Sequence, residues 1–226
     1  MSLIKFIEQL QTPYCERIGA GPLDEPLNAI SNLAFAVAAI LAAVHIHKRQ
    51  VVGLFPRILP WSIGAVAVAS TIYHTLRSPL TFVVDALSLS IFMVVAIFFV
   101  LRKITARTIS AILLGTAFLS VEGVALFCVP EGFLNGSTPH VIALVFVVLL
   151  MGLISRRHES LARQVVPIAA FYAVAIVCRT IDMAICSWLP IGTHFLWHVA
   201  GAIAAFLTIR FALLIEAVGQ QQQAAA

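Results

Sequence analysis

The stretch HFLWHVAGAIAAFLTIRFALL, residues 194–214, decides how the chain can fold, because it is apolar over a membrane-spanning length. A spanning helix needs about 20 mostly apolar residues. His194 and His198 open this run four positions apart, so on a helix they lie one turn from each other on the same face. Ionisable groups inside a membrane are costly and usually functional. The pair therefore marks a candidate metal site.

The composition indicates an integral, multi-pass membrane protein. Of its 226 residues, 61% are hydrophobic and 11% are charged, and the mean hydropathy is +1.02. A soluble domain is nearer half apolar and a quarter charged. The net charge of +4 reflects charge bias in the loops. No basic patch with interleaved aromatic residues and no phosphate-binding glycine loop is present, so we expect no nucleic-acid partner.

The apolar runs predict an all-α bundle of seven membrane-spanning helices in one domain, residues 1–219. The predicted spans are 27–47, 56–76, 82–101, 108–128, 138–155, 164–187 and 192–215. Residues 1–26 form an outer N-terminal segment, in which Leu3, Ile4, Ile7 and Leu10 share one helical face and favour a short helix on the membrane surface. The polar tail, residues 220–226, is expected to be disordered.

The orientation follows from basic residues in the short loops. The loops after the first, third and fifth spans carry Lys48, Arg49, Arg57, Arg102, Lys103, Arg107, Arg156, Arg157 and Arg163. The loops after the second, fourth and sixth spans contribute only Arg77. Cytoplasmic loops are the basic ones, so we predict the N-terminus outside and the C-terminus in the cytoplasm.

This orientation brings polar residues of the second and third spans to one depth. Ser70 and His74 close the second span near its outer end, and Asp85 opens the third. The turn between these spans is centred near Pro79, with His74 and Asp85 at similar distances before and after it. The two side chains are therefore expected at the same level on neighbouring helices.

The other spans place their polar residues in the same outer half. Asp182, near the end of the sixth span, and His198 lie at equal distances from Pro190. The first span opens from the outside with Glu25, Asn28, Ser31 and Asn32. The charge rule that set the orientation did not use these residues. Their convergence therefore predicts one site facing the non-cytoplasmic side.

Three histidines with one open coordination position are typical of a catalytic zinc site, which favours His74, His194 and His198 as ligands. The alternative is that they hydrogen-bond across helices as structural polar residues. Asp85 either transfers protons or orients a ligand histidine. Ser70 either contributes its hydroxyl to the site or permits close helix contact.

Arg179 and Asp182 form the other charged pair of the outer half. We expect a buried ion pair that braces the sixth span, with contact to the substrate as the alternative.

The order and spacing of these motifs resemble the alkaline ceramidase family, which belongs to a wider seven-span group that includes the adiponectin receptors. The resemblance runs from Tyr14-Cys15-Glu16 to Gly201. It rests on Glu25-x-x-Asn28-x-x-Ser31-Asn32, Ser70-x-x-x-His74, Asp85, Arg179-x-x-Asp182-x-x-x-Cys186 and His194-x-x-x-His198. The resemblance implies a zinc-dependent amidohydrolase that cleaves the N-acyl bond of ceramide to a sphingoid base and a fatty acid. The zinc ligands match His74, His194 and His198, and the flanking serine and aspartate match Ser70 and Asp85.

The chain departs from the family in its N-terminal segment, where animal members hold a calcium ion. Glu16 and Glu25 match two of the calcium ligands, but Pro13 and Ile18 stand at two other ligand positions. Asp24 is the acidic residue that would compensate. Hard cations need six or more oxygen ligands, so a calcium site at Glu16, Asp24 and Glu25 and its absence both stay open.

The resemblance also bears on the cysteines. Cys15 and Cys186 match cysteines of the family pattern, and both fall on the outer side, where disulfides persist. We therefore predict a disulfide between them and free thiols at Cys128 and Cys178.

Two other functions stay open. One is a receptor of the adiponectin-receptor type, which the lack of sizeable soluble extensions disfavours. The other is a transporter or structural metal protein, which would be expected to show broken, repeated helices. If the chain is a hydrolase, its substrate is ceramide or another N-acyl lipid of the membrane. The sequence predicts no oligomeric state.

Overall fold

The computed structural model describes residues 11, 13–19, 21–50, 54–105, 107–130, 132–156 and 159–224. All regular elements within these residues are helical, as predicted. They are α2 (Pro26–Ser31), α3 (Leu33–Lys48), α4 (Leu54–Leu76), α5 (Pro79–Thr105), α6 (Thr108–Cys128), η1 (Phe133–Gly136), α7 (Thr138–Ser155), α8 (Glu159–Ile181), η2 (Met183–Ile185) and α9 (His194–Ala224). The surface helix predicted at Leu3–Leu10 lies outside the described residues.

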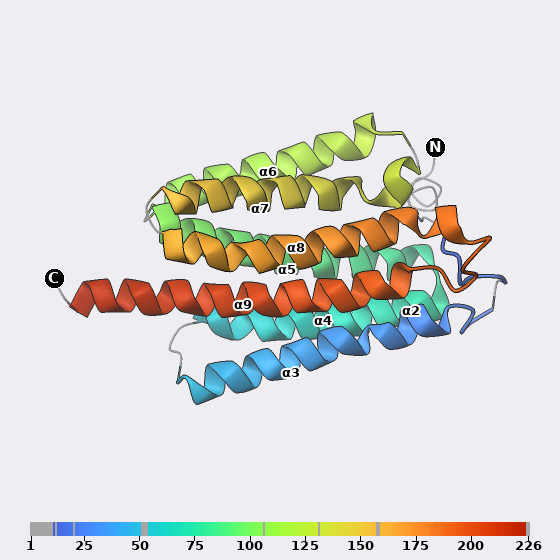
Figure 1. The fold of residues 1–226 in the computed structure, drawn as a ribbon, viewed down its shortest axis with the longest axis horizontal. Coiled ribbons are helices and arrows are strands. Elements are labelled where there is room, and N and C mark those ends of the chain that lie inside the picture. The colour runs from blue at the N-terminus through green and yellow to red at the C-terminus, as the bar shows by residue number, and fades with distance from the viewer. Residues whose placement is uncertain are drawn as a thin grey trace.

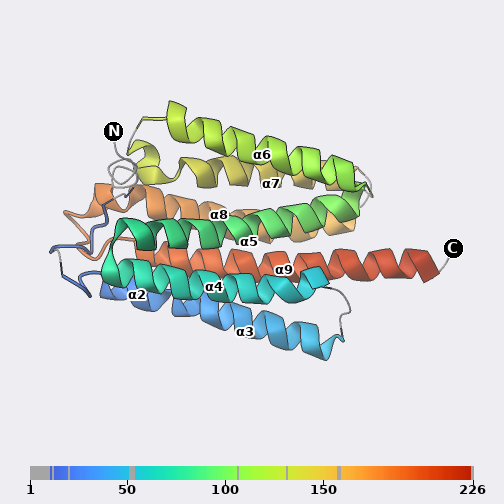
Figure 2. The same ribbon diagram turned by 180° about the vertical axis from the view of Figure 1, so that it is seen from behind.

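The long helices run side by side as one bundle with α9 in the middle (Figure 1). α9 packs on α8, α3, α5 and α4, while α6 and α7 form an outer pair next to α5 and α8. The view from behind shows α4 and α5 covering the other side of α9 (Figure 2). The apolar window of α9 is 56% buried and that of α6 is 11% buried. This contrast makes α9 the central helix and α6 the peripheral one.

Six segments are long and apolar enough to cross a membrane, by length and composition. They are Pro26–Lys48, which joins α2 and α3, and the main parts of α5, α6, α7, α8 and α9. The chain is therefore a multi-pass membrane protein. α4 is as long as these, with 23 residues, and packs between α3 and α5. It is not among the six segments, so the count of seven spans stays a prediction, as does the orientation.

The two largest differences between helix ends and predicted spans lie at the ends of α8 and α9. α8 ends at Ile181 instead of 187, because the chain leaves the helix at Asp182 and turns back toward α9. α9 continues to Ala224, into the tail that was expected to be disordered. Glutamine and alanine are good helix formers, which accounts for this extension.

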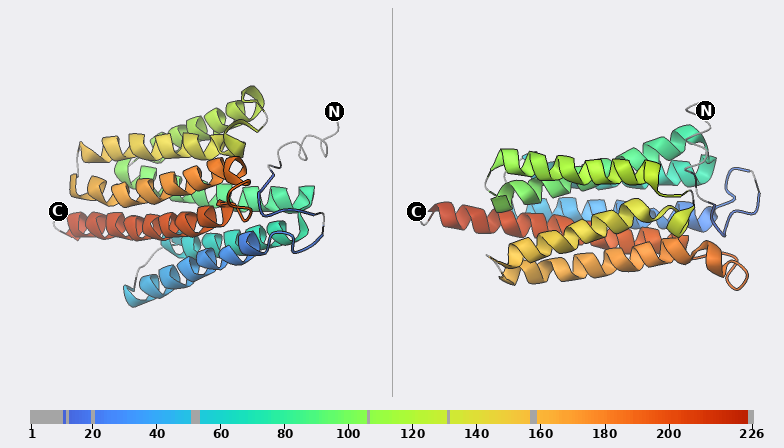
Figure 3. Two further views of the ribbon diagram at one scale, coloured as in Figure 1. Left: turned by 45° about the vertical axis from the view of Figure 1, so that its right-hand side comes forward. Right: turned by 90° about the horizontal axis from the view of Figure 1, so that it is seen from above.

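One end of the bundle collects segments that are distant in the sequence. The start of α9, the chain between α8 and α9, α2 and the described N-terminal residues all lie there, as the two rotated views show (Figure 3). The end of α4 and the start of α5 lie at the same end (Figures 1 and 2). The polar residues that the sequence places in the outer half are carried by these segments.

Candidate metal centre

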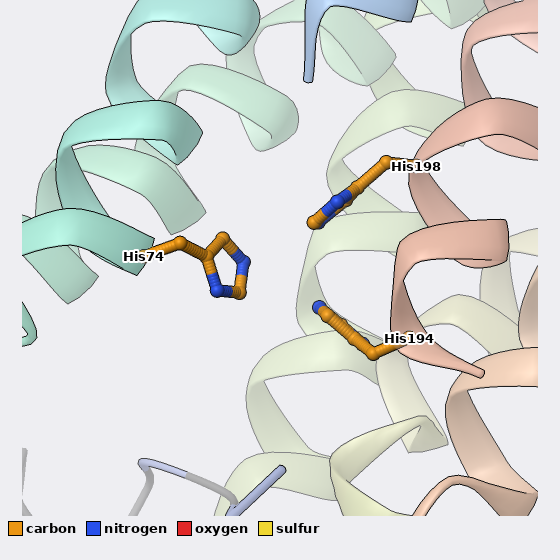
Figure 4. A group of neighbouring side chains, drawn as sticks. All are labelled: His74, His194 and His198. Carbon is orange, nitrogen blue, oxygen red and sulfur yellow. The ribbon is translucent and has the colours of Figure 1, made fainter. Parts of the chain in front are cut away.

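Three histidines converge at this end of the bundle. His74 comes from the last turn of α4, and His194 and His198 come from the first two turns of α9. Figure 4 shows the three imidazoles turned toward one another from the two helices. Their exposed fractions are 1%, 1% and 2%. Each offers one ring nitrogen, and these atoms all lie within 4.8 Å of one another, so the group could hold a metal ion.

Two of the histidines are oriented by partners from the first span. Nδ1 of His74 lies 2.6 Å from Oε2 of Glu25, and Nδ1 of His198 lies 2.7 Å from the hydroxyl of Ser31. Because Nδ1 is engaged in both rings, Nε2 remains as the nitrogen that could bind a metal. Ligand histidines commonly bond through their other nitrogen to a carboxylate or another polar group. The contacts of His74 and His198 follow that pattern.

Glu25 is fully buried and lies among positive groups. Its Oε1 is 3.2 Å from Nη1 of Arg17 and 3.3 Å from Nη1 of Arg77. Nδ2 of Asn28 donates to its Oε2 at 3.4 Å. Burial acts to raise the pKa of Glu25, but the hydrogen bond to His74 and the nearby arginines lower it below its ordinary value. The ionised carboxylate accepts the proton of His74 Nδ1, which fixes the tautomer of that ring.

The short helix α2 is held from both ends. The Glu16 carboxylate accepts the backbone N–H groups of Leu27 at 2.5 Å and Asn28 at 2.9 Å. The first amides of a helix have no partner within it, so an acidic side chain there stabilises the helix. Further along, Ser31 Oγ and Asn32 Nδ2 both donate to the carbonyl of Asn28, at 3.0 Å and 2.9 Å. These bonds place Ser31 beside His198.

Asp182 connects three separate parts of the chain. Its Oδ2 accepts the N–H of Cys15 at 3.0 Å. Its Oδ1 accepts the N–H groups of Thr193 at 2.6 Å and His194 at 2.9 Å, at the start of α9. The Asp182 carboxylate thus accepts three backbone N–H groups, because the chain after η2 folds back onto it. Arg179 donates from Nη1 to the hydroxyl of Tyr14 at 3.2 Å, and its ion pair with Asp182 stays a prediction.

Gly192 allows this approach of chain segments. Its φ is +64°, in the left-handed region that side chains rarely adopt. A Cβ at this position would overlap Oδ1 of Asp182 and lie 2.7 Å from Cβ of Cys15. Only glycine therefore fits between the N-terminal segment and the start of α9.

A disulfide joins Cys15 to Cys186, with their Cα atoms 5.2 Å apart. This is the pair that the sequence predicts, and Cys128 and Cys178 are free thiols. The bridge ties the N-terminal segment to the chain just after η2, a few residues from Asp182. The segment around Cys15 is thus fixed both covalently and by the Asp182 hydrogen bond.

Ser70 and Asp85 face each other from α4 and α5. Ser70 is buried one turn before His74, and its hydroxyl is close enough to the half-buried Asp85 carboxylate to interact with it electrostatically. The Arg179 guanidinium is close enough to interact electrostatically with Asp85. A carboxylate, a hydroxyl and a histidine therefore lie on adjoining turns of two neighbouring helices.

The three candidates for calcium have separate partners. Glu16 accepts backbone N–H groups at the start of α2. Asp24 accepts the N–H of Gly21 at 2.7 Å, and Glu25 contacts Nδ1 of His74. In the part of the chain that the structure describes, the histidine triad is the only group of three or more His, Cys, Asp or Glu side chains whose ligand atoms lie close enough to hold one metal ion. The described contacts therefore do not gather Glu16, Asp24 and Glu25 into one cation site.

The donor set of the triad fits a metal ion. Nδ1 of His194 is buried and has no hydrogen-bond partner among the described residues, although buried polar atoms normally have one. Three imidazole nitrogens that lie within 4.8 Å of one another are the kind of donors that zinc takes in a three-histidine site.

A comparison with known protein families shows to which family the chain belongs. The family model described as Ceramidase matches residues 22–226. The chain belongs to the ceramidase family. No curated protein matches the chain as a relative. Membership confirms the resemblance read from the motifs, and it implies a hydrolase that acts on an amide bond of a lipid.

The residues around the triad include several that the motifs did not single out. Tyr14 stacks on His194, and Arg17 and Arg77 pair with Glu25. Arg77 could have been noticed as the one basic residue in the outer loops. The only signal for Tyr14 was its place beside Cys15.

Proposed function

We propose that the protein is a zinc-dependent hydrolase within the membrane that cleaves the N-acyl bond of ceramide, releasing a sphingoid base and a free fatty acid. The observation that carries this proposal is the buried His74–His194–His198 triad, together with family membership. Nitrogen ligands in a set of three, with room for a further ligand, suit catalytic zinc. Such a zinc ion would acidify a water molecule and polarise the amide carbonyl.

Asp85 is the proposed general base and acid. It accepts a proton from the attacking water while the water oxygen bonds to the amide carbon. When the carbon–nitrogen bond breaks, Asp85 returns that proton to the leaving amine. The products are a carboxylic acid and an amine, so atoms and protons balance.

Ser70 acts in step with Asp85. Its hydroxyl is close enough to the Asp85 carboxylate to interact with it electrostatically, and in the proposed resting state it donates a hydrogen bond to that carboxylate. Once Asp85 carries the proton from water, it no longer needs the hydroxyl as a donor, and Ser70 can donate to the oxyanion that forms on the substrate. The same proton transfer thus makes the base neutral and the oxyanion donor available.

The membrane body has a role in substrate binding. The centre lies at one end of a bundle whose helices are largely apolar, so the acyl chain would lie along the spans while the amide reaches the histidines. We place this end on the non-cytoplasmic side, in accordance with the basic loops.

The test is hydrolysis of a long-chain ceramide by the purified protein in detergent, measured as free fatty acid. A strong chelator should abolish release, and added zinc should restore it, whereas added magnesium should not. Metal analysis should find about one zinc per chain, as expected for a single three-histidine site, and none in the His74→Ala/His194→Ala/His198→Ala variant. Stoichiometric zinc in that triple variant, or hydrolysis insensitive to metal removal, would contradict the proposal. Activity only on other N-acyl lipids would keep the mechanism and change the substrate.

A further inference from the structure

Tyr14 lies directly over one of the three histidines. Its ring stacks on that of His194 with the centroids 3.9 Å apart and the planes inclined by 26°. It is 5.3 Å from the His74 ring in a tilted arrangement. Tyr14 is 4% exposed, so this contact is buried. Stacked rings at such distances attract each other and restrict rotation.

His194 differs from the other two histidines in what orients it. His74 and His198 each bond through Nδ1 to a side chain of the first span, but Nδ1 of His194 has no hydrogen-bond partner in the described chain. Its backbone N–H donates to Oδ1 of Asp182 at 2.9 Å. This bond fixes the position of the His194 backbone but leaves the rotation of the imidazole ring undetermined. Besides the other two histidines of the triad, the aromatic ring that contacts the His194 ring is that of Tyr14, which is the nearest of the three.

Tyr14 is itself held in place from several directions. Arg179 donates to its hydroxyl at 3.2 Å, and the Arg77 guanidinium carbon lies 4.6 Å from its ring centroid. The next residue, Cys15, is bound to Cys186 by the disulfide and to Asp182 by its N–H. Asp182 therefore fixes both the backbone of His194 and the chain that carries the ring stacked on it.

We propose that Tyr14 is a positioning residue that orients His194 for metal binding by ring stacking, and that the Cys15–Cys186 disulfide acts on the centre through Tyr14. This inference rests on the proposed function, because it requires the triad to bind a metal. It assigns to the N-terminal segment the role that Glu25 and Ser31 have for the other two histidines.

The test measures metal affinity by chelator competition, together with the visible absorption spectrum of the Co²⁺-loaded protein, which reports ligand geometry. Tyr14→Leu removes the ring face and should weaken metal binding about 10–100-fold, the usual effect of losing a group that orients a ligand. It should also alter the cobalt spectrum. Tyr14→Phe keeps the ring and should retain both the affinity and the spectrum of the original protein. Phe82→Leu is the matched control, because the Phe82 ring packs on Tyr73 and not on a histidine of the triad. This variant should keep both the metal affinity and the cobalt spectrum of the original protein.

A second arm tests the disulfide. Cys15→Ser/Cys186→Ser should weaken metal binding, and adding Tyr14→Leu should weaken it little further, because both changes act on the same contact. Tyr14→Met, whose flexible unbranched side chain adapts to an irregular space without supplying a ring, carries the test if Tyr14→Leu is not recovered folded.

Unchanged affinity and spectrum in Tyr14→Leu or Tyr14→Met would overturn the inference while leaving the proposed zinc site intact. Additive effects of the cysteine and tyrosine changes would overturn the link through the disulfide. If the unsubstituted protein binds neither zinc nor cobalt, the proposed function itself fails.

Discussion

Oε2 of Glu25 lies 2.6 Å from Nδ1 of His74, and both side chains are buried. The contact joins the residue just before α2 to the last turn of α4, so the orientation of one metal-binding ring depends on a carboxylate from another helix. Glu25→Gln keeps the shape of the side chain and removes its charge. We expect metal affinity to fall about 10–100-fold, because the carboxylate that orients the ligand and strengthens its basicity is gone.

The measurement is chelator competition on the purified variant. Glu159→Gln is the control, since Glu159 is exposed and pairs with Arg163 one turn away on α8. It should bind metal as the original protein does. Equal affinity in Glu25→Gln and Glu159→Gln would show that Glu25 does not support the centre.

Asp85→Asn tests the proposed proton transfer. The amide cannot accept a proton at neutral pH, so hydrolysis should fall about 10²–10⁴-fold with the metal still bound. Release of fatty acid and zinc content are measured on the same samples. Ser70→Ala should keep the metal and lose a smaller factor. A loss of zinc affinity in Asp85→Asn, of about 10–100-fold, would instead assign Asp85 to ligand support.

Gly192→Ala tests the close approach of the N-terminal segment to α9. The left-handed φ costs about 1–2 kcal/mol for a residue with a side chain, and overlap with Asp182 adds about 1–3 kcal/mol. Together these should lower Tm by about 4–20 °C. Gly132→Ala is the matched control, because Gly132 has φ +72° and no neighbour within 4 Å of a new Cβ. Equal losses in the two variants would mean that backbone strain accounts for the whole effect.

The orientation can be measured at Cys128, which is exposed at the end of α6. The basic-loop rule places this residue outside, so a membrane-impermeant maleimide should label it in intact cells. In the Cys128→Ser background, Ser155→Cys at the end of α7 should be labelled only after permeabilisation. Reversed labelling would place the metal centre on the cytoplasmic side.

The sequence predicts at which level along the bundle the histidines lie, but it does not predict which side chains hydrogen-bond to them or stack on them. Apolar runs and loop charges indicated at what level each polar residue lies, and that sufficed to bring His74 and His194 together. Hydrogen-bond partners depend on how each helix is rotated and how loops return, which a pattern of apolar residues does not specify. The pairing of Ser31 with His198 and the stacking of Tyr14 on His194 are therefore visible only in the structure.

Asp182 shows how the end of a helix adds partners that a helical pattern does not predict. Arg179 and Asp182 are three positions apart, and such neighbours on a helix often form ion pairs. The helix ends at Ile181, however, so Asp182 no longer follows the helical geometry. Free backbone amides of the returning chain then become its donors.

The Cys15–Cys186 bridge spans a sequence separation of 171 residues, and this imposes an order on biosynthesis. The N-terminal segment is made first, yet its partners Asp182 and Cys186 emerge only after most helices have entered the membrane. Cys15 therefore cannot form the bridge until Cys186 has been made and has reached the same side of the membrane. The segment around Cys15 thus docks long after its own translation, and nascent chains stalled before residue 182 should carry a Cys15 that alkylates freely.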